Sequence, residues 1–238
     1  MSHPNTQTGI QAVLFDKDGT LFDFYATWGE WVKTILQENS HQDPQRAIAM
    51  GQAIGYDVQT GQFAPDSMVI ADTPADIAAA LMRFFPDHSH NSLIDYLNER
   101  AAQAPQIEAV PLKPLLRGLR TQGLQLGVAT NDAQAPALAH LQAAGIAELF
   151  DFVAGCDSGH GCKPAPGMQL AFAEKTNLPP ARIAMVGDST HDLIAGRAIG
   201  MATVAVLTGV AKQPDLSPHA DVVLPDIGHL PAWIASLR

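Results

Sequence analysis

Cysteines and long apolar segments are scarce in this chain, and each shortage excludes a class of protein. Among 238 residues there are 2 cysteines, Cys156 and Cys162, too few for the disulfide framework of a small secreted domain. No apolar run approaches the roughly 18 residues of a membrane-spanning helix, and the first residues lack the charged and then apolar pattern of a signal peptide. We therefore expect a soluble protein of a reducing, cytoplasmic compartment.

Basic residues are also few. The chain has 14 Lys and Arg against 24 Asp and Glu, a formal net charge of -10. Nucleic acids and anionic membranes are bound by clusters of basic side chains, so we predict that neither is a partner. An anionic substrate can approach such a protein only where a bound cation or a lysine reverses the local field. No pattern in the sequence predicts an oligomeric state.

The second half of the chain alternates between short apolar runs and helical segments. We expect strands at residues 124–129, 152–154, 183–186 and 202–207, with helices of roughly ten residues between them. This alternation is typical of parallel sheets whose right-handed crossovers place helices on both faces. With a first strand at residues 10–15, the pattern predicts a doubly wound, Rossmann-like α/β fold.

Residues 23–108 interrupt this alternation with helical patterns and no convincing strand. Apolar residues share one face of the first expected helix: Trp28, Trp31, Val32, Ile35 and Leu36. Asp43 and Thr73, each followed by proline, are typical helix starts. We therefore predict an all-helical domain of residues 23–108, inserted into a discontinuous core of residues 1–22 and 109–238.

The first expected strand ends in two aspartates. Apolar residues 10–15 lead directly into Asp16-Lys17-Asp18-Gly19. Side chains alternate along a strand, so Asp16 and Asp18 would point the same way, at the strand end where open α/β sheets bind ligands. Two carboxylates so close need a cation between them or a proton on one. A polar strand end leading into an Asp-Gly turn is the simpler alternative.

Further polar residues follow other segments on the same expected rim. Thr130 and Asn131 follow one strand, Asp188 follows another with Asp192 one helical turn later, and Lys163 precedes a proline in the loop between them. Singly, these residues have ordinary explanations: a helix cap, a turn, a solvated helix position or an exposed loop lysine. Their joint placement on one rim favours a shared site.

In their order and spacing these segments resemble the four motifs of the haloacid dehalogenase-like hydrolases. The matching segments are Asp16-Lys17-Asp18-Gly19-Thr20, Thr130, Lys163-Pro164 and Gly187-Asp188-Ser189-Thr190-His191-Asp192. One motif alone is weakly specific, whereas four in order are strong. The helical insertion resembles that family's cap domain, and residues 16–23, Asp-Lys-Asp-Gly-Thr-Leu-Phe-Asp, resemble its phosphoglycolate phosphatase branch.

The resemblance implies a chemistry for the two aspartates and a metal. Asp16 would attack phosphorus to form an aspartyl-phosphate, and Asp18 would protonate the leaving alkoxide and then activate water. Mg²⁺, which prefers oxygen ligands, would be held by Asp16, the backbone carbonyl of Asp18 and Asp188. Asp192 would hold a metal-bound water or steady Lys163.

The resemblance also implies how a phosphate is bound. Thr130, Asn131 and the backbone amides there would hold phosphoryl oxygens at the start of a helix. Lys163 would neutralise charge on Asp16 and on the transferred group. Lys163 and the metal would together provide the local positive charge that the acidic chain otherwise lacks.

These roles imply a magnesium-dependent phosphatase acting on a small phosphorylated metabolite, with 2-phosphoglycolate as one candidate. A phosphomutase of the β-phosphoglucomutase type shares the same core residues and stays an alternative. A 2-haloacid dehalogenase needs no acid for its leaving group, so Asp18 argues against that reaction. A non-catalytic binding protein would be expected to lack Asp16 or Asp18, and both are present.

The insertion should select the substrate. If 2-phosphoglycolate is the substrate, a cation must meet its carboxylate, and the basic residues of the insertion are Lys33, Arg46, Arg83 and Arg100. Lys33 and Arg83 fall outside the apolar helix faces, as solvated residues do.

Three further features have two interpretations each. Cys156, His160 and Cys162 suggest a thiolate metal site, but their spacing fits no standard zinc pattern and a fourth ligand is missing. His191 either touches the substrate or is an exposed loop histidine. For the two tryptophans of the first inserted helix we favour packing within the insertion over stacking on a substrate.

Overall fold

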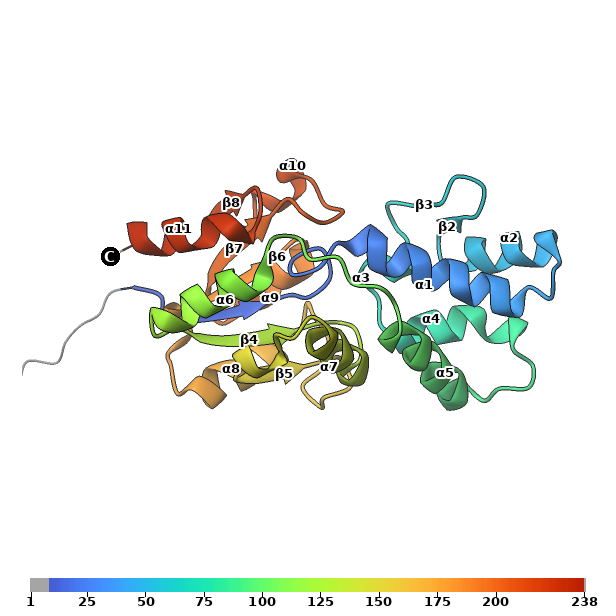
Figure 1. Cartoon of the computed structure of the whole chain (residues 1–238), viewed down its shortest axis with the longest axis horizontal. Coiled ribbons are helices and arrows are strands. Elements are labelled where there is room, and N and C mark those ends of the chain that lie inside the picture. The colour runs from blue at the N-terminus through green and yellow to red at the C-terminus, as the bar shows by residue number, and fades with distance from the viewer. Residues whose placement is uncertain (1–8, 238) are drawn as a thin grey trace, which may run out of the picture.

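A computed structural model describes residues 9–237, with a six-stranded sheet at its centre (Figure 1). The strand order is β5-β4-β1-β6-β7-β8, and the bounds are β1 Ala12–Phe15, β4 Gln125–Ala129, β5 Phe152–Ala154, β6 Ile183–Gly187, β7 Ala202–Val206 and β8 Val222–Leu224. Every neighbouring pair in this sheet is parallel. The chain starts at the centre and winds outward in both directions, which confirms the predicted α/β fold.

The central strand, β1, positions the rest of the rim. All its residues are buried, and Phe15 lies beside Val128 of β4 and Val186 of β6. Because parallel strands in this register end together, the residues that follow β1, β4 and β6 emerge at one edge of the sheet.

Helices cover both faces of the sheet (Figure 1). Their bounds are α6 Leu112–Thr121, α7 Gln134–Ala143, α8 Gly167–Thr176, α9 Thr190–Ala198, α10 Gln213–Leu216 and α11 Leu230–Ser236, with short 3₁₀ helices η2 Ala147–Leu149, η3 Pro180–Arg182 and η4 Ile227–His229. Val13 and Phe15 pack with α6, α7 and α11, whereas Ala12 and Leu14 pack with α8. The two-residue alternation of β1 thus supplies apolar side chains to both helical layers.

A second group of helices lies beside the rim of the sheet (Figure 1). Their bounds are α1 Phe24–Asn39, α2 Pro44–Ala53, α3 Met68–Ala71, α4 Pro74–Leu81, η1 Met82–Phe84 and α5 His90–Ala102. They enclose their own apolar cluster, which includes both tryptophans of α1. The predicted helix starts are confirmed, since Asp43 caps α2 and Thr73 forms a capping box with Asp76 at α4.

The prediction of no strand in this segment is wrong in one detail. Tyr56–Asp57 (β2) and Gln62–Phe63 (β3) pair as an antiparallel hairpin. Gly61 has a φ of 70° in the connection, a conformation that glycine adopts without strain. Strands of two residues show no alternation that a sequence pattern could reveal.

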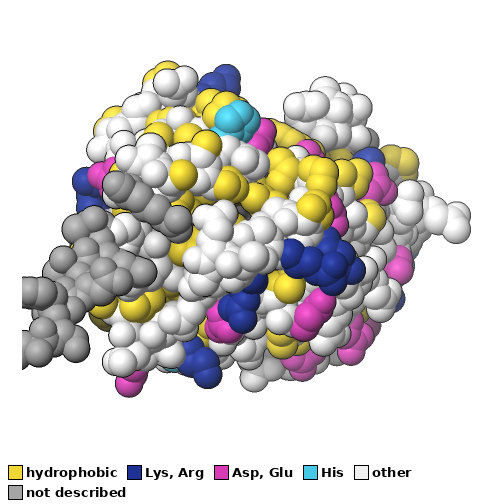
Figure 2. All heavy atoms as spheres, turned by 60° about the vertical axis from the view of Figure 1, so that its left-hand side comes forward, with side chains coloured by type: hydrophobic (Ala, Val, Ile, Leu, Met, Phe, Trp, Pro, Cys, Tyr) yellow, Lys and Arg dark blue, Asp and Glu magenta, His cyan; other side chains and the backbone are white. Residues whose placement is uncertain are grey.

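Figure 2 shows one face of the molecule, on which Lys and Arg side chains are scattered among Asp and Glu rather than gathered. Among residues 9–237, no helix has both the length and the apolar character to cross a membrane.

Candidate active site

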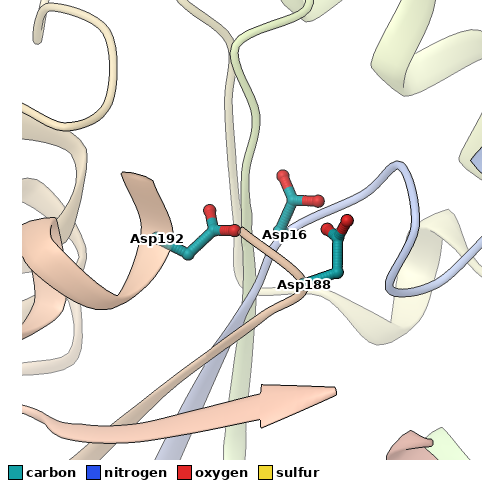
Figure 3. A group of neighbouring side chains, drawn as sticks. All are labelled: Asp16, Asp188 and Asp192. Carbon is teal, nitrogen blue, oxygen red and sulfur yellow. The ribbon is translucent and has the colours of Figure 1, made fainter. Parts of the chain in front are cut away.

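Three buried carboxylates meet at the rim of the sheet. Asp16 follows β1, Asp188 follows β6, and Asp192 lies in the first turn of α9. One oxygen atom of each lies within 4.8 Å of the others, and Figure 3 shows the three side chains gathered at the end of β1. The rim therefore concentrates negative charge where water is largely excluded.

Lys163 lies between two of these carboxylates. Its Nζ donates to Asp16 Oδ1 at 2.6 Å, to Asp192 Oδ1 at 2.6 Å and to the carbonyl oxygen of Ala129 at 2.8 Å. Burial alone would lower the pKa of Lys163, but Asp16 and Asp192 outweigh burial and raise it. Lys163 is therefore a permanent positive charge beside Asp16.

One lysine does not neutralise three carboxylates. Burial raises the pKa of Asp16 to about 7, assisted by Asp192 and Asp18 and opposed by Lys163. Burial, Asp16 and Asp192 likewise raise the pKa of Asp188 well above its ordinary value. A divalent cation with a preference for oxygen ligands would relieve this repulsion, so the donor set fits Mg²⁺.

Two backbone segments pass so close to the Asp188 side chain that only glycine fits at the points of approach. A Cβ at Gly209 would lie 1.6 Å from Asp188 Oδ2, and one at Gly19 would lie 2.5 Å from the same atom. Thr20 Oγ1 donates to Asp188 Oδ1 at 3.4 Å. The glycine of the first motif and the loop after β7 therefore form the walls around this carboxylate.

Asn131 is placed at the rim as predicted, but its side chain has other partners. Its Oδ1 accepts from the backbone N–H of Lys163 at 2.8 Å, and its Nδ2 donates to the carbonyls of Lys163 and Ala71, each at 2.9 Å. The amide thus clamps the lysine loop and reaches the helical insertion. Because its side-chain amide is already bonded to backbone groups, Asn131 can offer a phosphate only its backbone N–H.

Thr130 is buried immediately after β4. Its Oγ1 accepts from the backbone N–H of Asp132 at 3.1 Å, and the N-cap position of α7 is Ala133. The alternative that Thr130 is simply the cap of this helix is therefore wrong, because the hydroxyl tightens the turn before the cap.

A second buried charge cluster lies behind the first, and the sequence did not reveal it. Lys17 is fully buried, with its Nζ 2.8 Å from Asp18 Oδ2, 3.2 Å from Asp132 Oδ2 and 3.0 Å from His140 Nδ1. It also lies 5.5 Å from the ring centroid of Trp28. Strand alternation indicates that Lys17 points away from Asp16, and a lysine buried there must find acidic partners.

His140 connects this cluster to the helical insertion. The Lys17 ammonium can only donate, so His140 Nδ1 accepts and Nε2 carries the proton, which it donates to the carbonyl of Ala101 in α5 at 2.7 Å. A second proton would set two cations face to face. Burial and Lys17 accordingly lower the pKa of His140 from 6.5 to about 4.

This neutral histidine predicts acid sensitivity. The folded state resists a proton that the unfolded chain accepts, so stability falls as the pH drops from about 6.5 toward about 4. Between about pH 7 and pH 5, His140 should account for a loss of about 2 kcal/mol in the free energy of unfolding. Denaturant unfolding should show that His140→Gln, whose amide can still donate to Ala101, removes this part of the loss.

The control for that measurement comes from the same cluster. Burial raises the pKa of Asp132 to about 6, so protonation of Asp132 stabilises the folded state over part of the pH range in which protonation of His140 destabilises it. Only the difference in the free energy of unfolding between wild type and variant therefore isolates His140. An unchanged slope in His140→Gln would contradict the neutral assignment.

A cavity separates the rim from the helical insertion. It contains about 720 Å³ of unfilled space, including its open mouth, and Asp16, Asp18, Thr130, Lys163 and Asp188 line its floor. His191 and both tryptophans of α1 also line it. The tryptophans thus pack within the insertion, as favoured, and also form a wall of the cavity.

The two cysteines do not form a metal site. A disulfide joins Cys156 and Cys162, whose Cα atoms lie 4.7 Å apart, in the loop before Lys163. Bonded sulfurs offer no thiolate to a metal. The metal-binding interpretation of His160 with these cysteines is dropped.

Comparisons with known proteins agree with this geometry. The sequence model of the haloacid dehalogenase-like hydrolases matches residues 10–200. A phosphoglycolate phosphatase of Escherichia coli O157:H7 is 34% identical over 240 residues, covering 93% of this chain and 91% of that protein. The probable phosphatase IndB of Dickeya dadantii is 30% identical over 215 residues, covering 90% and 88%.

A solved structure supports the fold. CbbY from Rhodobacter sphaeroides, in complex with phosphate, superposes with a TM-score of 0.70 at 20% identity, covering 95% of this chain and 99% of that one. With the motif residues on one rim and a family match over most of its length, the chain belongs to the haloacid dehalogenase-like hydrolases, on their phosphoglycolate phosphatase-like branch.

Proposed function

We propose that the protein is a magnesium-dependent phosphatase that hydrolyses the phosphate monoester of a small metabolite through an aspartyl-phosphate. The observation that carries this proposal is the bridge from Lys163 Nζ to Asp16 and Asp192, beside Asp188. A nucleophilic carboxylate needs a fixed orientation and a neighbouring positive charge that lowers the repulsion from an anionic phosphate. The bridge supplies both.

In the first step, an oxygen of Asp16 attacks phosphorus and the bond to the leaving oxygen breaks. Asp18, which lines the floor of the cavity, would carry a proton in the substrate complex and give it to that oxygen, and the alcohol departs. In the second step, water attacks the phosphorus of the aspartyl-phosphate, Asp18 takes the proton, and Asp16 is released as a carboxylate with inorganic phosphate.

Other residues hold the reacting groups. Thr130 and the backbone amides after it would bind phosphoryl oxygens, while Lys163 offsets the charge that accumulates on them. Asp16, the backbone carbonyl of Asp18 and Asp188 would hold Mg²⁺, which supplies further positive charge for the attack. We assign residues 23–108 to a cap domain that shields the aspartyl-phosphate from bulk water and contacts the leaving group.

Removal of metal is the direct test of this proposal. Chelation by EDTA should abolish hydrolysis of p-nitrophenyl phosphate, and excess Mg²⁺ should restore it, because the carboxylate cluster otherwise repels the substrate. Beryllofluoride with Mg²⁺ mimics an aspartyl-phosphate, so together they should raise the melting temperature by several degrees beyond the shift that Mg²⁺ alone produces.

The possible outcomes separate the alternatives. Full activity in EDTA would remove the metal from the proposal, and the absence of any further thermal shift on adding beryllofluoride to Mg²⁺ would count against the covalent intermediate. Glucose 1-phosphate converted to an isomer without phosphate release would favour the mutase.

A further inference from the structure

The basic residues of the helical insertion lie outside the cavity. Lys33 is exposed and pairs with Glu30 at 2.6 Å on the surface of α1. Arg100 Nε donates to Glu38 Oε2 at 2.7 Å, which ties α5 to α1. Neither lines the cavity, so neither can meet a substrate there in this arrangement.

The other two basic residues also have structural partners. Arg46 Nε donates to the carbonyl of Asn39 at 2.9 Å, its guanidinium also bonds the carbonyl of Phe84, and it lies 5.7 Å from that ring's centroid. Arg83 is exposed and stacks on the same ring at 4.7 Å. None of the four predicted partners of a substrate carboxylate is therefore available at the site.

The wall that the insertion presents to the cavity is mainly apolar. Phe24, Trp28, Val69, Ile77 and Leu97 line it, and each is also buried in the apolar cluster of the insertion. Such a wall gains free energy by covering a hydrocarbon or aromatic surface. The leaving group of 2-phosphoglycolate has a single methylene group to set against it.

The polar groups on that wall include no cation that could pair with a carboxylate. Asp72, at the end of α3, and Asn98, in α5, line the cavity on the side of the insertion. Asp72 is exposed, so its repulsion of an anionic leaving group is partly screened by water, and both side chains can accept a hydrogen bond from a hydroxyl or an amine.

The rim of the sheet offers no replacement. Within residues 9–237, the cavity lining contains one lysine and no arginine, and that lysine, Lys163, is already bonded to Asp16 and Asp192. His191, in the first turn of α9, also lines the cavity and follows Asp188 closely in the chain. A carboxylate on the leaving group would therefore face Asp72 and an apolar wall.

We propose that the substrate is the phosphate monoester of an uncharged alcohol with a ring or other bulky apolar body and at least one hydrogen-bond donor, and not 2-phosphoglycolate. This inference rests on the proposed phosphatase function. The phosphate would occupy the rim, the apolar body would pack on Trp28 and Ile77, and the donor would face Asp72 or Asn98. The relatives named phosphoglycolate phosphatase would then share the reaction but not the substrate.

Matched alkyl phosphates test this inference. 2-Phosphoglycolate, 2-hydroxyethyl phosphate and benzyl phosphate have leaving alcohols of comparable basicity, so differences in kcat/KM report the cavity rather than the chemistry. Benzyl phosphate should exceed 2-phosphoglycolate by at least about ten-fold, with 2-hydroxyethyl phosphate between them. Equal or better turnover of 2-phosphoglycolate would overturn the inference.

Two further measurements separate the substrate preference from the phosphatase activity itself. In Asp72→Asn the ratio of kcat/KM for benzyl phosphate to kcat/KM for 2-phosphoglycolate should fall at least about three-fold. Asp66→Asn removes an exposed charge outside the cavity and should preserve that ratio. Calorimetry with Asp16→Asn should show tighter binding of benzyl phosphate, and tighter binding of 2-phosphoglycolate would refute the preference. Failure to hydrolyse p-nitrophenyl phosphate would instead refute the proposed function.

Discussion

Asp16→Asn should lower the turnover of p-nitrophenyl phosphate by at least about 10⁴-fold. An amide has the shape of the carboxylate but is a far weaker nucleophile toward phosphorus, so the aspartyl-phosphate cannot form. The loss should appear in kcat rather than as a simple rise in KM. Steady-state kinetics with Mg²⁺ present would measure both.

The fold should survive this substitution. The pKa of Asp16 is raised to about 7, so the folded state holds a proton that the unfolded chain releases, and ionisation of Asp16 destabilises the protein as the pH rises above about 4. Removing that charge should keep or raise the metal-free melting temperature at pH 8. Asp87→Asn, at an exposed carboxylate, is the matched control and should retain activity.

Thermal shifts would separate a chemical loss from a structural one. Beryllofluoride with Mg²⁺ should stabilise wild type and Asp87→Asn but not Asp16→Asn, because the adduct needs the carboxylate oxygen. Retained turnover in Asp16→Asn would rule out this residue as the nucleophile.

The rim of the site could be predicted from sequence because its geometry follows from the sheet. A buried run such as residues 12–15 must be a central strand, and parallel strands bring their carboxyl ends to one edge. Asp16, Thr130, Lys163 and Asp188 therefore came together once the strands were found.

The other charge cluster depends on packing that no local pattern encodes. Lys17 finds Asp132 and His140 only because α7 lies against both the end of β1 and the insertion's α5. The same limit applies to substrate choice. Whether Arg46 faces the cavity or Phe84 depends on how α2 packs on η1, which helix periodicity leaves open.

Lys163→Met should lower kcat/KM for p-nitrophenyl phosphate by about 10³-fold, the second largest effect we expect. The methionine fills the space of the lysine stem but leaves Asp16 and Asp192 without their shared cation. Repulsion then opposes both the approach of an anionic phosphate and the alignment of Asp16. Lys175→Met, at an exposed position near the end of α8, is the matched control and should stay fully active.

The same substitution should make stability depend on pH in a defined direction. Breaking a buried ion pair by removing one partner costs about 3–5 kcal/mol, and here the cost falls on carboxylates whose pKa values burial already raises. Without Lys163 those pKa values rise further, so the folded state binds more protons than the unfolded chain and its stability falls as the pH rises from about 4 to above about 7. In denaturant unfolding without metal, the free energy of unfolding of Lys163→Met should thus lie slightly below that of wild type near pH 5 and far below it near pH 8. Adding Asp16→Asn to Lys163→Met should recover part of the deficit, because one uncompensated charge is then gone, whereas a deficit equal at both pH values would mean that the lysine contributes by packing alone.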